Sequence, residues 1–252
     1  MRPLSRWIPL TLDVPMRPLL ILKTGQTLPS LRTQGEDFED WIRHGLDGAA
    51  TLTVDVTAGQ PLPELSSCSG IVVTGSPAMV TDQAEWSERS AGYLRAALAC
   101  SLPVLGICYG HQLLAHALGG VVGYHPQGRE IGTVDIRLNA AHGGDALFAG
   151  LPARFPAHAT HSQSVLQLPP GAVLLASSEH DAHHAFRVGE LAWGVQFHPE
   201  FDARIMRTYI QERQQDLRRE GLDVEALLGQ VRPTPEATRL LRDFARLARQ
   251  GV

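Results

Sequence analysis

The sequence predicts an α/β domain in which a mostly parallel sheet is flanked by helices and continues into an antiparallel extension. Short, almost entirely apolar runs of strand length alternate with longer amphipathic stretches in the first half of the chain, as in parallel sheets covered on both faces. After about residue 120 the strand-like runs follow one another through turns. The sequence shows neither an internal repeat nor a linker rich in Gly, Ser or Pro, so we expect one domain over residues 17–252.

Composition excludes several classes of protein. The 252 residues suit one large domain, and 22 Lys and Arg against 26 Asp and Glu give a net charge of −4, which disfavours nucleic-acid binding. No window approaches the ~18 uninterrupted apolar residues of a membrane-spanning helix. Three cysteines are too few for a disulfide framework, so we expect a cytoplasmic protein.

The first residues differ from the rest of the chain. Residues 1–15 contain two arginines, three prolines and short apolar pieces, without the apolar core and cleavage site of a secretory signal. Met16 directly precedes the first strand-like run. We therefore expect residues 1–16 to be a disordered extension without a chemical role.

Four apolar runs predict the parallel strands, at 19–23, 51–56, 70–74 and 102–107. Apolar residues recur at helical spacing over residues 36–46 and 85–100, which lie between these strands and predict helices. Asp82 and Glu85 have the spacing of a capping box before the second helix.

The second half predicts strands at 132–138, 173–176, 184–188 and 191–197, and then helices. Thr234 followed by Pro235 is typical of a helix start. The apolar stripe of the helix that follows comprises Ala237, Leu240, Leu241, Phe244 and Leu247.

One cysteine has the sequence context of a nucleophile. An apolar strand runs directly into Gly106-Ile107-Cys108-Tyr109-Gly110 and then into a helix, which is the strand–turn–helix pattern of a nucleophile elbow. So sharp a turn leaves no room for side chains at its flanks. The helix N-terminus favours a thiolate. Cys68 and Cys100 lack glycine flanks, and we interpret them as buried packing residues.

A base follows a later strand. In Val195-Gln196-Phe197-His198-Pro199-Glu200 the proline favours extended geometry at His198, so its imidazole and the Glu200 carboxylate can point the same way. Five other histidines are interpreted as surface or turn residues: His44, His116, His125, His142 and His158. His180, His183 and His184 lie together in a loop without a nearby cysteine, so we expect no metal site there.

These motifs resemble those of the class I (triad-type) glutamine amidotransferases, in particular the amidotransferase domain of GMP synthases. The resemblance runs from about residue 19 to residue 209. It implies a flavodoxin-like fold and hydrolysis of the glutamine side-chain amide through a cysteine thioester, without a cofactor. It also implies Cys108 as nucleophile, His198 as general base and then acid, and Glu200 as the carboxylate that orients His198.

The resemblance also implies binding roles. Gly75, in Thr74-Gly75-Ser76-Pro77, would form the oxyanion hole with the backbone N–H of Tyr109, and Ser76 stands where the family has a second glycine. Gln112 and the segment Thr160-His161-Ser162-Gln163 match residues that hold the α-amino and carboxylate end of glutamine. Ser162 and Gln163 replace a glycine and an aspartate of that segment. Glu130 matches a position that we interpret as structural support.

Three functions compete. The leading one is a glutaminase that supplies ammonia to a synthetase partner, because no phosphate-binding loop for activating an acceptor is present. The second is a γ-glutamyl hydrolase acting on γ-glutamyl amines or peptides with the same residues. The third is a non-catalytic regulatory protein on this fold, which the intact triad disfavours.

Overall fold

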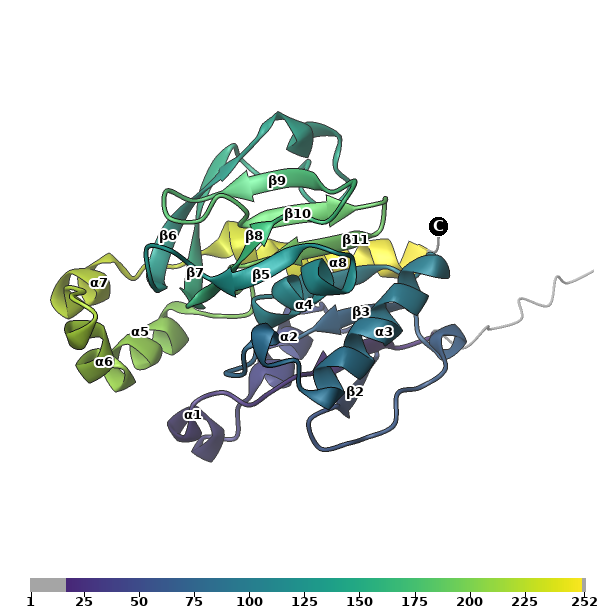
Figure 1. Ribbon diagram of the computed structural model, residues 1–252, viewed down its shortest axis with the longest axis horizontal. Helices are drawn as coiled ribbons and strands as arrows, with labels where there is room; N and C mark the ends of the chain where they lie inside the picture. Colours follow the sequence, from purple (N-terminus) through teal and green to yellow (C-terminus); the bar gives the residue numbers. More distant parts are fainter. Residues whose placement is uncertain (1–16, 251–252) are drawn as a thin grey trace, which may run out of the picture.

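A nine-stranded mixed sheet forms the centre of the computed structural model, which describes residues 17–250 (Figure 1). In spatial order its strands are β2 (Thr51–Asp55), β1 (Leu19–Lys23), β3 (Gly70–Val73), β4 (Val104–Ile107), β11 (Ala192–Val195), β10 (Ala185–Val188), β9 (Val173–Ser177), β6 (Glu130–Leu138) and β7 (Arg154–His161). From β2 to β11 neighbouring strands are parallel, and from β11 to β7 they are antiparallel. The predicted fold class is confirmed. The expected extension at 1–16 lies outside the described residues.

Helices cover both faces of this sheet. The α-helices within residues 17–250 are α1 (Pro29–Thr33), α2 (Phe38–Gly45), α3 (Glu85–Ala99), α4 (Tyr109–Ala117), α5 (Ala203–Glu212), α6 (Gln214–Arg219), α7 (Val224–Gln230) and α8 (Pro235–Gln250). Within residues 17–250, none of them combines the length and apolar character needed to cross a membrane.

The alternation of side chains along β1 explains the two layers. Leu19 and Ile21 point to the face covered by α2 and α8, whereas Leu20 and Leu22 pack with residues of α3 and α4 on the other face. Figure 1 shows α3 and α8 on opposite sides of the parallel strands. All four side chains are buried, because successive residues of a strand face opposite sides of its sheet.

Some elements differ from the prediction. Strand β7 and the small sheet of β5 (Val121–Tyr124) and β8 (Gln163–Gln167) were not predicted, since they carry Pro156, Gly123 and several polar residues that weaken a strand pattern. The capping box at Asp82 and Glu85 is wrong. Helix α3 begins after Ala84 without a side-chain cap.

The parallel strands bring three separate segments of the chain together. The residues that follow the carboxyl ends of β3, β4 and β11 are neighbours because β4 lies between β3 and β11 and pairs with both. Ligands of open α/β sheets bind at this edge. Gly75, Cys108 and His198 therefore converge there.

Candidate active site

Cys108 occupies a strained turn between β4 and α4. Its φ of 51° and ψ of −100° are unfavourable for a side chain, and its N–H donates to Val195 O at 2.8 Å. A Cβ on Gly106 would lie 2.3 Å from Gly110 O, and one on Gly110 would lie 2.6 Å from Val73 O. Both glycines of the motif are therefore required by packing, as the sequence predicts.

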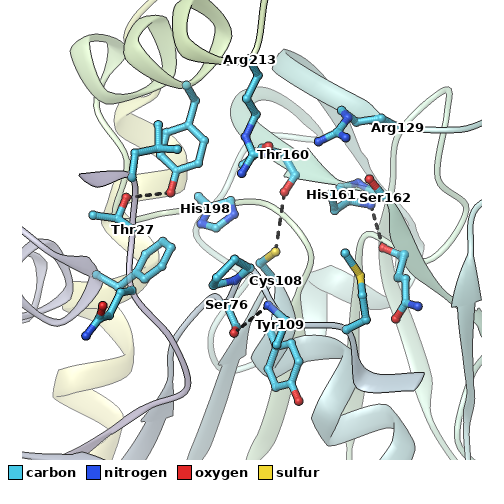
Figure 2. A pocket seen from close by; sticks show the side chains of 18 of the residues that line it. Thr27, Ser76, Cys108, Tyr109, Arg129, Thr160, His161, Ser162, His198 and Arg213 are labelled. Atoms are coloured by element: carbon cyan, nitrogen blue, oxygen red, sulfur yellow. Dashed lines mark hydrogen bonds between the residues drawn. The ribbon is translucent and has the colours of Figure 1, made fainter. Parts of the chain in front are cut away.

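His198 and Glu200 form a buried pair beside this cysteine. Nδ1 of His198 lies 2.7 Å from Glu200 Oε1, and the backbone N–H of His198 donates to His158 O at 2.7 Å. Nε2 is buried without a hydrogen-bond partner within residues 17–250, and Figure 2 shows Cys108 next to the ring. The structure thus brings all three predicted triad residues together.

Aromatic rings fix the plane of the His198 imidazole. Phe201 stacks on it with ring centroids 4.1 Å apart, and Phe38 stacks at 6.3 Å. Burial by itself lowers the pKa of His198, but the negative charges of Glu200 and Cys108 outweigh burial and raise this pKa to about 10. The environment of His198 therefore favours the protonated ring.

We expect NMR titration of the His198 ring to show a pKa near 10, well above the ordinary value of 6.5. Because the folded-state pKa exceeds the unfolded one, the imidazolium stabilises the fold fully below about pH 6.5. That contribution is lost as the pH rises towards 10. Glu200→Gln removes the carboxylate and should lower the pKa. A ring that titrates near 6.5 in both proteins would contradict the charge assignment.

The loop after β3 is held by the loop after β1. The Thr24 hydroxyl donates to Gly75 O at 3.2 Å, and the Ser76 hydroxyl donates to Thr24 O at 2.7 Å. A Cβ on Gly75 would lie 3.0 Å from Cε1 of His198, so the loop contacts the triad. Within the described chain, the N–H groups of Gly75 and Tyr109 have no hydrogen-bond acceptor. Ser76, at the position where the resemblance implies a second glycine, anchors this loop.

The turn between β7 and β8 covers the cysteine. Sγ of Cys108 lies 3.8 Å from Thr160 O (Figure 2). The Gln112 side-chain nitrogen donates to Gln163 O at 2.7 Å, and Nδ1 of His161 lies 3.0 Å from the same oxygen. Gln112, Thr160, His161, Ser162 and Gln163 all line the pocket, as expected of a binding segment.

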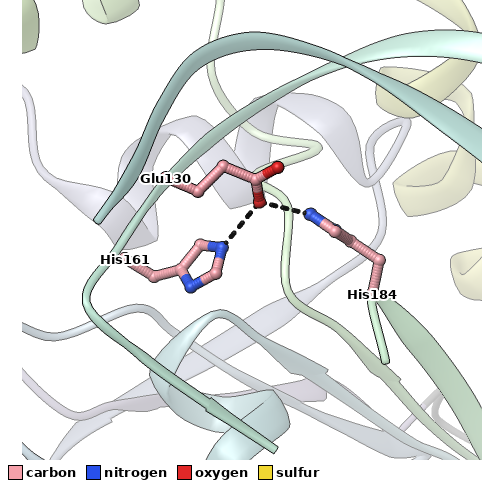
Figure 3. A group of neighbouring side chains, drawn as sticks. All are labelled: Glu130, His161 and His184. Carbon is pink, nitrogen blue, oxygen red and sulfur yellow. Dashed lines mark hydrogen bonds and ion pairs between the residues drawn. The ribbon is translucent and has the colours of Figure 1, made fainter. Parts of the chain in front are cut away.

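A buried hydrogen-bond network supports this turn. Oε2 of Glu130 lies 2.9 Å from Nε2 of His161 and 2.7 Å from Nε2 of His184 (Figure 3). Burial by itself raises the pKa of Glu130, but the hydrogen bonds from both histidines hold it well below its usual range. These three side chains have ligand atoms close enough for a metal ion, within 4.8 Å of one another. Their mutual hydrogen bonds account for the arrangement, and Glu130 occupies the supporting position that was predicted.

Two interpretations of single residues are wrong. His158 is fully buried on β7, with Nδ1 3.2 Å from the Thr133 hydroxyl, whereas His44, His116, His125 and His142 are exposed or half-buried. Burial and the neighbouring His198 lower the pKa of His158 to about 4, so it is neutral. Cys68 is buried as predicted, but Cys100 is exposed at the end of α3. Nothing in the neighbouring sequence indicates that His158 is buried or that Cys100 is exposed.

A pocket of about 370 Å³ opens above Cys108. Sequence reasoning missed several residues that line it, because they come from loops and helices placed by tertiary packing. They are Thr27, Phe38, Met79, Arg129, Tyr209 and Arg213. Tyr209 is held at 2.7 Å by the Thr27 hydroxyl, and burial raises the pKa of its phenol. The ring that stacks on His198 could have been predicted from the sequence, because Phe201 directly follows Glu200.

The model of the glutamine amidotransferase class-I family matches residues 35–215. The chain belongs to this family. A GMP synthase (glutamine-hydrolyzing) of Thermomicrobium roseum is 44% identical over 135 residues, which are 53% of this chain and 24% of that protein. One of Aeropyrum pernix is 37% identical over 142 residues, covering 56% of this chain and 25% of its own length. The chain matches about a quarter of the length of these curated relatives.

Solved family structures share the fold. A glutamine amidotransferase of Thermotoga maritima superposes with a TM-score of 0.74 at 24% identity, covering 92% of this chain and 98% of that one. A glutamine amidotransferase of Methylobacillus flagellatus gives 0.73 at 25% identity, covering 94% and 96%. The likeness extends over more than nine-tenths of the chain.

Proposed function

We propose that this chain hydrolyses the side-chain amide of L-glutamine through a thioester on Cys108. The observation that carries the proposal is the placement of Cys108 on its elbow beside the His198–Glu200 pair, inside a pocket. A strained nucleophile, a base and an orienting carboxylate are the three parts of nucleophilic acyl transfer.

Hydrolysis then takes place in two stages, acylation of Cys108 and hydrolysis of the thioester. Sγ of Cys108, as thiolate, attacks the amide carbon, and the oxyanion that forms is stabilised by the N–H groups of Gly75 and Tyr109. His198 gives its Nε2 proton to the leaving nitrogen, so the C–N bond breaks and ammonia departs. Neutral His198 then takes a proton from water as it attacks the thioester. The C–S bond breaks, glutamate leaves, and the thiolate–imidazolium pair is restored, while Glu200 holds the ring throughout.

The ammonia would be used by a synthetase. The relatives whose names include glutamine-hydrolyzing are GMP synthases, and this chain matches about a quarter of each. A synthetase that binds the competent arrangement of the oxyanion loop would increase its population. We infer that the acceptor is activated by a partner.

Ammonia release from L-glutamine by the purified chain tests this function. We expect slow hydrolysis by the chain alone and an increase when a co-purified synthetase or fractionated lysate is added, since one misplaced oxyanion donor costs about 10²–10³ in rate. A high rate that no partner changes, and that extends to γ-glutamyl amines, would favour the γ-glutamyl hydrolase. No turnover with any fraction would favour a regulatory protein.

A further inference from the structure

The pocket above Cys108 contains positive charge and no carboxylate. Arg129 and Arg213 are among its lining residues, and none of the described lining residues is Asp or Glu. Gln163, which also lines the pocket, has a neutral side chain. Glutamine carries both a carboxylate and an ammonium group. The positively charged lining complements the carboxylate and not the ammonium group.

The two arginines differ in what they already bind. Arg129 makes a two-pronged ion pair with Glu220, at 2.9 Å from Nε and 3.0 Å from Nη2. Arg213 has neither an ion pair nor a side-chain hydrogen bond to any residue in 17–250, and its Nε is buried without a partner. The positive charge of this half-buried guanidinium is therefore not compensated by the described residues and can pair with a carboxylate that enters the pocket.

Arg213 is fixed in place above the nucleophile. It lies at the junction of α5 and α6, and its guanidinium carbon is 5.9 Å from the centre of the Tyr209 ring, which the Thr27 hydroxyl holds. Figure 2 shows Arg213 directed towards Thr160 and His198, with Cys108 on the far side of them. The guanidinium therefore has its ligand end in the same pocket as the reacting sulfur.

We infer that Arg213 binds the carboxylate of the substrate and that the site takes short ω-amides with a free carboxylate, whether or not they carry an α-ammonium group. This inference rests on the proposed amide hydrolysis. A planar guanidinium matches a carboxylate with two parallel hydrogen bonds.

The neutral side chain at position 163 explains why the substrate does not need an α-ammonium group. Nε2 of Gln163 donates to the Thr81 hydroxyl at 2.6 Å, and Oε1 is buried without a partner among residues 17–250. The Gln163 side chain therefore presents no negative charge to an ammonium group in the pocket. Moving the ammonium out of water is therefore poorly compensated, and an amide without it loses little.

Binding to Cys108→Ala, which cannot form the thioester, separates this inference from turnover. The matched probes are L-glutamine, glutaramate (glutamine without its amino group) and glutamine methyl ester (glutamine without its carboxylate charge). We expect calorimetry to show glutaramate binding within about threefold of glutamine or tighter, and the ester binding at least tenfold more weakly. Arg213→Gln should weaken the binding of glutamine and of glutaramate by about tenfold to a hundredfold, the range of a charged hydrogen bond. It should not affect the binding of the ester. Arg218→Gln, an exposed arginine on α6, is the control and should change nothing.

Glutamine binding more than tenfold tighter than glutaramate would overturn the inference, because the ammonium would then be recognised. Equal weakening of the ester by Arg213→Gln would show a structural role only. Absence of binding by both carboxylates would also overturn it. Ammonia release from glutamine is measured on the chain with Cys108 intact, so the proposed function stands or falls independently.

Discussion

His198→Ala should lower the rate of ammonia release by about 10⁴-fold or more, the usual cost of removing the base of a catalytic triad. Cys108 then loses the imidazolium beside it, and the leaving nitrogen loses its proton donor. Steady-state assay with glutamine, in the presence of any partner that activates the chain, measures the effect. Glu200→Gln should lose a smaller factor, because Glu200 orients the ring and exchanges no proton.

Controls separate chemistry from folding in this experiment. His198→Asn retains a side-chain N–H that can reach the buried Glu200, and circular dichroism should show an unchanged fold. His116→Ala removes a partly exposed histidine that pairs with Glu88 at 2.9 Å, and it should retain full activity. Near-normal turnover by His198→Ala would refute the assignment of the base.

Gly110→Ala should both destabilise the protein and inactivate it. The added Cβ would lie 2.6 Å from Val73 O and 2.8 Å from Val73 Cβ, so helix α4 and strand β3 must move apart. Overpacking of this kind lowers the free energy of unfolding by about 1–3 kcal/mol. It also separates the N–H groups of Tyr109 and Gly75, which we expect to cost about 10²-fold or more in rate. Denaturant titration and the glutaminase assay measure the two effects.

Gly229→Ala is the matched control. Gly229 lies in α7, where an added Cβ meets no atom of residues 17–250 within 4 Å. This change should leave turnover unaltered and raise helix stability by up to about 1 kcal/mol. If Gly110→Ala behaved like Gly229→Ala, the elbow would not require a glycine.

The motifs at Cys108 and His198 could be predicted because strand and turn chemistry are local. An apolar strand, two glycines and a following helix specify the elbow, and Pro199 sets the geometry between His198 and Glu200. Pairing of parallel strands then brings both motifs to one sheet edge. Both motifs are therefore predictable from neighbouring residues and from the rule that ligands of open α/β sheets bind at the carboxyl ends of the strands.

The rest of the site depends on long-range packing. Arg213 reaches the pocket because α5 packs with its neighbours, and nothing in its sequence surroundings marks it. The burial of His158 likewise follows from the pairing of β7 with β6, a strand that its proline and polar residues conceal. The network of Glu130, His161 and His184 joins three segments whose contact no local pattern indicates.

Labelling with diazo-oxo-norleucine, a reactive glutamine analogue, tests whether Cys108 is the nucleophile of a glutamine site. The purified chain is treated at neutral pH with and without excess glutamine, and its peptides are mapped by mass spectrometry. We predict one adduct, on Cys108, which glutamine prevents, although Cys100 is the more exposed thiol. Equal labelling of Cys68, Cys100 and Cys108, or labelling that glutamine does not reduce, would contradict a glutamine site built around Cys108.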